Sequence, residues 1–468
     1  MDRVGPLPAN IRYPKIAAAL LAAIVIASRL CHSGVLWADD NLPLAAAAEV
    51  FRGKTLYRDV WYDKPPLVVW TYLLWGARAG IALRLAGAVY VLAVAFAAWK
   101  AARLRWTERE AALAALFAVI FLTFGLPSAV IPLASDMLLI LPHLAAIYFA
   151  WRGKPFWSGA AAGAGLLCSS KAIFVLAACA VWQWRALPLL LAGFAAPNAI
   201  AAGWMLAHGS LAEFYKQAWE WGSIYARNSF VENPLEEGLN RTGAWMYFQL
   251  ALVAGAAITL RRERDWRLIA WIALSFIGVI LGFRFFPRYY FLLLAPMMVI
   301  AARGWAAGRM YWAGAVILLA IPVARFAPRY ITAARGEPWH DLDIDRDSRA
   351  AAQKLRELAA PGDNLFVWGF RPDIFIDSGL PAGTRFLESQ PISGVLADRH
   401  LFSSAAVAAD FLEANRAELA RSRPVWVVDG LGLYNPSLAL DRQPYLAAWL
   451  SQYREVGRTG FSILYHLR

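Results

Sequence analysis

Two adjacent carboxylates, Asp39 and Asp40, follow the first hydrophobic segment of the chain and open a loop rich in charge. An ionisable group at a membrane boundary is costly to keep there, so its presence points to a function. A carboxylate beside a wet cavity can take a proton from a hydroxyl as a general base. Because two acids this close repel each other, burial would raise the pKa of one of them. Asp136, at the outer end of a later hydrophobic segment, is the third candidate catalytic acid.

The candidate partners of these acids are basic residues on the same side of the predicted membrane. They are Arg58, Lys64, Arg84, Lys171, Arg284 and Arg288. Cations gathered near carboxylates in the outer head-group layer suit a bound phosphate, because Arg offers bidentate contacts and Lys a point charge. Each one alone is more typical of a side chain that reaches to the membrane surface. Together with the acid pair they predict an anion-binding site.

The composition is that of an integral membrane protein. Of the 468 residues, 60% are hydrophobic and 17% are charged. A helix needs about 20 mostly apolar residues to cross the hydrocarbon. On this basis we expect about eleven transmembrane helices. They lie near residues 15–36, 80–99, 109–126, 128–150, 156–170, 171–184, 186–207, 243–260, 267–284, 289–303 and 309–327.

The positions of Lys and Arg between these segments predict the orientation. Bases before the first segment, at 100–109 and at 261–264 all share one side. The positive-inside rule then places the N-terminus in the cytoplasm and the C-terminal tail in the periplasm. A net charge of +13 fits bases lying against anionic lipid better than it fits nucleic-acid binding. The first segment lacks a small-residue cleavage site and is interpreted as a retained span.

Two domains are expected. Residues 1–330 form a transmembrane catalytic domain whose first periplasmic loop covers 37–80, and residues 338–468 form a soluble periplasmic domain. In the loop, 43–52 predicts a short amphipathic helix, and 67–78 is too short to cross the membrane. One long tilted span over 67–99 is the alternative. In the tail, helices at 348–360, 404–421 and 445–453 alternate with strands at 365–369, 425–429 and near 461–467, which favours a small α/β domain with a mainly parallel sheet.

The first loop resembles a known signature. It is similar to that of the polytopic GT-C glycosyltransferases, in the branch that groups lipid A aminoarabinose transferases with protein O-mannosyltransferases. The residues that carry the resemblance are Asp39-Asp40, Gly53 and Tyr57-Arg58-Asp59-Val60-Trp61-Tyr62-Asp63-Lys64-Pro65-Pro66-Leu67. Weaker support comes from Ala134-Ser135-Asp136, from Gly163, Gly165 and Lys171, and from Phe286-Pro287-Arg288-Tyr289-Tyr290.

The resemblance implies a polytopic α-helical GT-C fold and a sugar donor linked to polyprenyl phosphate in the outer leaflet. It also implies inversion at the anomeric carbon. Asp39 would be the general base, Asp136 the acid of the second loop, Lys64 a contact to the donor phosphate and Tyr289 a residue near the donor. The chain departs from the family at Asp40, where Glu is more frequent. Arg288 stands where relatives often carry His, and 41–43 lack the Tyr common in the aminoarabinose branch.

We therefore expect a glycosyltransferase of a bacterial inner membrane. Its partners would be a polyprenyl-phosphate sugar donor, membrane lipids and a lipid, glycan or protein acceptor at the periplasmic face. The sequence contains no P-loop or dinucleotide fingerprint, so no nucleotide cofactor is expected. A divalent metal between the acids and the phosphate is left open. The alternatives are a membrane transporter or lipid flippase, which would spread charge through the membrane midplane, and a scaffold whose tail binds a partner.

Overall fold

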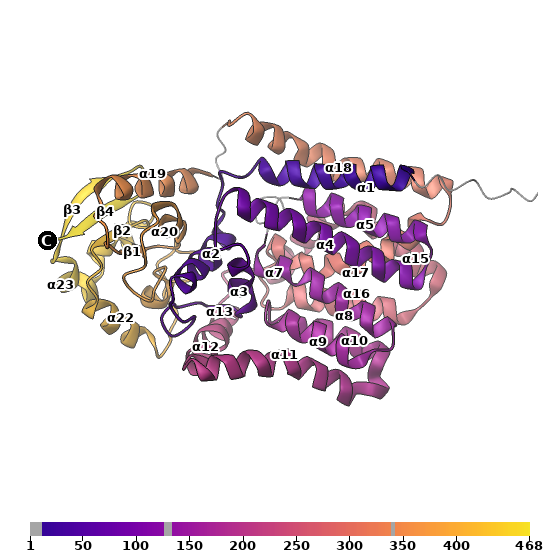
Figure 1. The fold of residues 1–468 in the computed structure, drawn as a ribbon, viewed down its shortest axis with the longest axis horizontal. Coiled ribbons are helices and arrows are strands. Elements are labelled where there is room, and N and C mark those ends of the chain that lie inside the picture. The colour runs from indigo at the N-terminus through magenta and orange to yellow at the C-terminus, as the bar shows by residue number, and fades with distance from the viewer. Residues whose placement is uncertain (1–11, 126–132, 338–341) are drawn as a thin grey trace, which may run out of the picture.

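The computed structural model describes residues 12–125, 133–337 and 342–468. A bundle of long helices lies at one end of the molecule and a smaller α/β part at the other (Figure 1). The bundle contains α1 (Arg12–Leu30), α4 (Ile81–Arg105), α5 (Glu108–Thr123), α8 (Ile140–Trp151), α9 (Pro155–Leu166), α10 (Ala172–Gln183), α11 (Leu187–Ala207), α15 (Leu250–Glu263), α16 (Trp266–Ile280), α17 (Phe291–Trp305) and α18 (Arg309–Ala334).

These helices overlap the segments expected to cross the membrane, but they differ in length. By length and composition, the described residues contain three helices able to cross, at Ile81–Arg105, Ala172–Ala207 and Met310–Ala334. A fourth is added if α14 (Pro234–Phe248) and α15, which meet at an angle of 88°, count as one broken span. A membrane character is therefore supported, while the number of eleven spans stays a prediction.

Small residues allow the bundle helices to pack closely. A Cβ atom added to Gly159 of α9 would lie 1.9 Å from the carbonyl oxygen of Leu190 in α11. A Cβ added to Gly193 would lie 2.0 Å from the carbonyl oxygen of Phe156. Only glycine fits at these two positions, which matches the small-residue packing of helices in membranes. The pair α9 and α11 therefore forms one rigid wall of the bundle.

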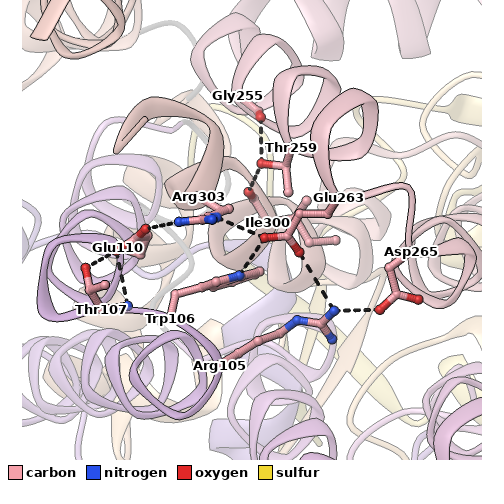
Figure 2. A network of polar contacts seen from close by, with 10 residues as sticks. All are labelled: Arg105, Trp106, Thr107, Glu110, Gly255, Thr259, Glu263, Asp265, Ile300 and Arg303. Atoms are coloured by element: carbon pink, nitrogen blue, oxygen red, sulfur yellow. Dashed lines mark hydrogen bonds and ion pairs between the residues drawn. The ribbon is translucent and has the colours of Figure 1, made fainter. Parts of the chain in front are cut away.

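A charged network joins five helices at the end of the bundle away from the sheet (Figure 2). Arg303 of α17 donates to Glu110 of α5 at 2.6 Å and to Glu263 of α15 at 2.9 Å. Arg105 of α4 pairs with Asp265, the residue before α16, at 2.5 Å. Each partner comes from a different helix, so the network holds these helix ends in register.

Short elements lie between the bundle and the sheet. They are α2 (Ala38–Phe51), α3 (Leu67–Leu73), α7 (Ser135–Leu138), α12 (Leu211–Phe214), α13 (Trp221–Arg227) and the 3₁₀ helix η3 (Pro287–Tyr290). The helix expected at 43–52 begins earlier, so Asp39 and Asp40 lie in its first turn, where acids complement the helix dipole. The alternative of one span over 67–99 is wrong, because the chain turns between α3 and α4 at Gly76 and Gly80, whose φ angles are +70° and +65°.

The C-terminal part is built around a four-stranded sheet of order β1-β2-β4-β3. Its elements are α19 (Asp343–Leu358), β1 (Leu365–Trp368), α20 (Asp373–Ser378), α21 (Gln390–Ser393), α22 (Leu412–Arg421), β2 (Trp426–Asp429), α23 (Ala447–Leu450), β3 (Tyr453–Arg458) and β4 (Ile463–Leu467). The pair β1 and β2 is parallel, while β2–β4 and β3–β4 are antiparallel.

The expectation of a mainly parallel sheet is therefore wrong. The error arises because the sequence analysis missed β3. Most side chains of β3 are exposed at the edge of the sheet, so the sequence pattern did not reveal it. β3 and β4 form a hairpin closed by a hydrogen bond from Thr459 N to Ser462 O of 2.9 Å. The helix expected at 404–421 is also shorter, since α22 begins at Leu412.

The C-terminal part packs directly on the first loop. Asn41 of α2 donates to the Asp373 carboxylate of α20 at 3.0 Å, and the Trp61 backbone donates to the Arg385 carbonyl at 2.7 Å. One buried apolar cluster contains Leu44 and Val68 of the loop as well as Ile374 of α20. The two parts of the molecule thus share a core, with the first loop between them.

Candidate active site

A cavity of about 410 Å³ opens where the first loop, the bundle and the C-terminal part meet. The first turn of α2, residues 63–65, α7 and the turn at 168–171 contribute to its wall. Residues 218–225, η3 and three short pieces of the C-terminal part also line it. Six of the residues expected at the site come from these segments. All six line the cavity: five are charged, namely Asp39, Lys64, Asp136, Lys171 and Arg288, and the sixth is the phenolic Tyr289.

Acids and bases alternate along the wall of the cavity. Arg288 donates to the Asp39 carboxylate, and its Nε also lies 3.9 Å from Asp136 Oδ2. Lys171 Nζ pairs with Asp136 Oδ1 at 3.0 Å, and Ser169 Oγ donates to the same oxygen at 3.3 Å. The four charged side chains are 10% to 25% exposed. Two carboxylates and two cations are thus held together in a partly desolvated place, where such contacts are stronger than at the surface.

Tyr289 completes the cationic end of this wall. The Lys171 ammonium lies 3.2 Å from the centre of the Tyr289 ring, within the range of a cation–π interaction. η3 begins with Pro287, which suits the first position of a helix, and it directs Arg288 and Tyr289 into the cavity. The short helix therefore presents a guanidinium and an aromatic ring side by side.

Lys64 is held in place by its own loop. The Tyr57 hydroxyl donates to the Lys64 carbonyl at 2.8 Å, and Tyr57 itself has a φ of +69°. That left-handed conformation is uncommon for a residue with a side chain. Among the residues that the structure describes, the Lys64 ammonium makes no ion pair. It is thus available to an anion in the cavity.

Asp40 lies beside the cavity without lining it. Its side chain is fully buried and accepts a hydrogen bond from the Tyr72 hydroxyl of α3. Burial raises the pKa of Asp40 to about 7, although the bond from Tyr72 acts in the opposite direction. The expected split between the two neighbouring acids is therefore present: Asp39 faces the cavity and Asp40 faces the protein interior.

Two of the expected phosphate ligands lie elsewhere. Arg58 is exposed and pairs with its neighbour Asp59 at 2.8 Å. Arg284 is 2% exposed, pairs with Asp398 and donates to the Tyr225 and Asn228 carbonyls at 2.5 Å and 2.7 Å. Neither guanidinium lines the cavity. Arg284 lies in the segment before η3, and its ion pair with Asp398 joins that segment to the C-terminal part.

Several lining residues were not expected from the sequence. Asp63 belongs to the first-loop motif, and its Oδ1 is buried without a hydrogen-bond partner in the described part of the chain. Trp221 and Tyr225 come from α13, in the segment between α11 and α14. Gln390 and Asp398 come from the C-terminal part. No local pattern marks these last two, because they reach the cavity only through tertiary packing.

The donor set does not fit a metal ion closely. Across the described ranges, no group of three or more His, Cys, Asp and Glu side chains converges on one point. Asp39 and Asp136 are instead bridged by the Arg288 guanidinium. A cation is thus already supplied by the protein between the two carboxylates.

Comparison with known proteins finds similarity in structure and none in sequence. No protein-family profile and no curated protein matches the chain. ArnT from Cupriavidus metallidurans in the apo state has a TM-score of 0.66 at 14% identity, over 98% of both chains. The same protein bound to undecaprenyl phosphate gives 0.63 at 16%, again over 98% of both.

A second relative comes from the archaea. The oligosaccharyltransferase AglB from Archaeoglobus fulgidus, in complex with an inhibitory peptide and a dolichol-phosphate, has a TM-score of 0.52 at 11% identity. The match covers 96% of this chain and 73% of AglB. ArnT, an aminoarabinose transferase, and AglB are both polyprenyl-phosphate-dependent glycosyltransferases of the GT-C type. The chain therefore has the GT-C fold, as the resemblance of its first loop implies.

Proposed function

We propose that the protein is an integral membrane glycosyltransferase that uses a polyprenyl-phosphate-linked sugar as donor. The observation that carries the proposal is the joint placement of Asp39, Asp136, Lys171 and Arg288 on the wall of one cavity, with Lys64 facing them. Undecaprenyl phosphate and dolichol-phosphate are bound by ArnT and AglB, which have the same fold. Clustered cations beside a carboxylate suit the same chemistry here.

Donor binding prepares the base. In the structure Arg288 is neutralised by Asp39. A donor phosphate that enters between Lys64 and Arg288 competes with Asp39 for the guanidinium. Once Arg288 turns to the phosphate, the Asp39 carboxylate is free to accept a proton. Binding of the correct donor thereby activates Asp39 as the general base. Lys171 continues to neutralise Asp136.

The transfer itself is a single displacement. The acceptor hydroxyl gives its proton to Asp39 while its oxygen forms a bond to the sugar C1. The bond from C1 to the phosphate oxygen breaks, and its electron pair leaves with polyprenyl phosphate. Lys64 and Arg288 stabilise the charge that develops on that oxygen, since they are already in place. Attack from the face opposite the leaving group inverts the anomeric carbon.

We place the cavity at the periplasmic face of a bacterial inner membrane. The support is the positive-inside pattern, which assigns the N-terminus to the cytoplasm and the C-terminal part to the periplasm. The division into a transmembrane region at 1–330 and a periplasmic region at 338–468 follows from the same reasoning. The acids and bases of the cavity lie together where the bundle meets the C-terminal part, which favours a transferase over a transporter or flippase, whose charge would be spread through the membrane midplane.

Replacing Asp39 with Asn tests the proposal. Loss of a general base lowers turnover by about 10²- to 10⁴-fold, whereas binding of undecaprenyl phosphate to the purified protein should be retained. The readout is mass spectrometry of glycolipids and glycoproteins from a deletion strain that carries either the wild type or D39N.

The matched control is Asp410→Asn, because Asp410 is an exposed acid that does not line the cavity. This variant should restore the same products as the wild type. If D39N also restores them in full, Asp39 is not the base and the proposed mechanism is wrong. If the deletion changes no glycoconjugate at all, the transferase assignment itself fails.

A further inference from the structure

A second cavity, of about 460 Å³, lies on the other side of η3. Pro287 and Tyr290 line this cavity, whereas Arg288 and Tyr289 line the candidate active site. The remaining walls come from α5, α14, α17 and α18, together with Gln249 between α14 and α15. The two cavities are therefore separate spaces that share one short helix as a wall.

The charged residues of the second cavity are all basic. Arg241, Arg325 and Arg329 line it, and none of the described residues in its lining is acidic. Arg241 is neutralised by Glu237 at 2.6 Å. Arg325 makes no ion pair with any residue in the described part of the chain, and its guanidinium lies 5.9 Å from the centre of the Phe248 ring. Arg325 is exposed on α18, a helix able to cross a membrane, and a charged side chain within a membrane-spanning helix is costly unless it has a partner.

Aromatic residues form much of the remaining lining. The Tyr290 ring stacks on Trp245 with centres 5.4 Å apart and planes at 20°. Tyr247, also part of the lining, is 61% exposed. On a bundle that spans a membrane, such an exposed face meets lipid. Aromatic rings beside a cation are the surface expected for an amphiphile at head-group depth.

The cavity also contains a break in a helix. α14 and α15 meet at 88°, and Gln249 lies between them. A broken helix at membrane depth is tolerated where it lines a cavity. Gln249 is 7% exposed, and its Oε1 has no hydrogen-bond partner in the described residues. A buried amide that lines a cavity without a partner costs free energy unless a ligand satisfies it.

We propose that this cavity binds one anionic glycerophospholipid whose head group carries a hydroxyl. The phosphodiester lies against Arg325, the head-group hydroxyl donates to Gln249 Oε1, and the upper acyl chains lie along Trp245 and Tyr290. The absence of an acid among the described lining residues makes this a binding site and not a second transfer centre. The inference does not depend on the proposed glycosyl transfer, because its readout is binding alone.

Calorimetric titration of the full-length protein in a neutral detergent tests the site with three probes. They are dihexanoyl phosphatidylglycerol, dihexanoyl phosphatidylcholine and inorganic phosphate. The wild type should bind phosphatidylglycerol, bind phosphatidylcholine more weakly and show no heat with inorganic phosphate beyond that which R325Q also shows, since phosphate held by the candidate active site does not depend on Arg325. Arg325→Gln should weaken phosphatidylglycerol by about tenfold, as expected for one lost charge-assisted contact. Gln249→Leu should weaken it by about fivefold through the lost hydroxyl contact.

The control is Arg335→Gln, the same substitution on an exposed arginine at the end of the same helix. It should leave phosphatidylglycerol affinity within about twofold of the wild type, a change below one hydrogen bond. Equal affinities for R325Q and R335Q, together with an unchanged Q249L, overturn the proposal. A heat of inorganic phosphate binding that R325Q abolishes also overturns it, because the second cavity would then hold a free anion. Q249L carries the test alone if R325Q does not fold.

Discussion

The guanidinium of Arg288 donates to the carboxylate of Asp39, although 249 positions separate the two residues in the chain. The contact joins η3, which directly precedes α17, to the first turn of α2 in the first loop. Asp136 lies 3.9 Å from the same guanidinium. One side chain thus sets the spacing of both carboxylates, and it is also the group that an incoming phosphate meets.

This relationship predicts opposite effects of two substitutions on carrier binding. Arg288→Gln removes a phosphate contact, so the Kd for undecaprenyl phosphate should rise by about 10- to 100-fold. Asp39→Asn removes the carboxylate that competes for Arg288, so its Kd should equal or fall below that of the wild type. Both values come from titration of the purified protein with undecaprenyl phosphate. Arg58→Gln, on an exposed arginine outside the cavity, is the control and should not change the Kd.

A weaker Kd in D39N would contradict the competition between carboxylate and phosphate. An unchanged Kd in R288Q would remove Arg288 from the donor site and leave Lys64 as the main cation there.

The buried pair of Arg284 and Asp398 predicts strong coupling between the bundle and the C-terminal part. The two side chains are 2% and 5% exposed, and removing Asp398 leaves the Arg284 charge buried without a carboxylate, while removing Arg284 leaves Asp398 paired only with Arg399 at 3.1 Å. A double-mutant cycle with Arg284→Met and Asp398→Ala should give a coupling energy of about 2 kcal/mol. The measurement is chemical denaturation followed by near-UV circular dichroism. Additive effects of the two substitutions would show that the pair does not act as a unit.

Glu388 predicts a pH dependence of stability. Burial raises the pKa of Glu388 to about 8, and Asp63 adds to the effect, against a usual value of 4.5. Between these two values the folded state holds a proton that the unfolded chain has lost. Stability from this group is therefore lost as pH rises from about 4.5 to about 8 and is constant above that.

Glu388→Gln removes this titration while keeping an oxygen for the Gln390 backbone N–H, which donates to Glu388 at 2.6 Å in the wild type. The apparent Tm of the variant minus that of the wild type should grow from pH 5 to pH 8. Glu357→Gln, on an exposed helix position of α19, should show a flat difference. A flat difference for E388Q as well would mean that Glu388 titrates normally.

Sequence reasoning predicted the parts of the molecule that rest on local patterns. Hydrophobic length identifies the bundle segments, and the motif from Asp39 to Lys64 identifies the first loop that lines the cavity. β3 escaped prediction because its exposed side chains lack the alternation of a half-buried strand. The GT-C fold was accessible only through the first-loop resemblance, since periodicity alone does not distinguish helical membrane folds.

The roles of Arg284 and Asp398 depend on tertiary contacts. From sequence, Arg284 and Arg288 are equivalent cations on one side of the membrane. In the structure, one reaches a carboxylate of the C-terminal part and the other a carboxylate of the first loop. Which acid each arginine meets is decided by how segments far apart in the chain pack, and no spacing rule contains that information.

The charged network at the far end of the bundle predicts a loss of stability without loss of donor binding (Figure 2). The Glu110 side chain is 4% exposed and accepts from Arg303 at 2.6 Å, and it also closes the capping box of α5 with Thr107. Glu110→Ala removes both contacts and should cost about 2 kcal/mol. Because Arg303 is 41% exposed, its own charge can turn to water and adds little to that cost.

The apparent Tm of the E110A protein in detergent should fall by about 2–4 °C, while its Kd for undecaprenyl phosphate stays at the wild-type value, because the network and the cavity lie at opposite ends of the bundle. Arg109→Gln, one position earlier on an exposed face of α5, is the matched control and should leave the Tm unchanged. If E110A also loses carrier binding, the helix ends joined by Arg303 transmit their register to η3 through α17, and the two ends of the bundle are coupled.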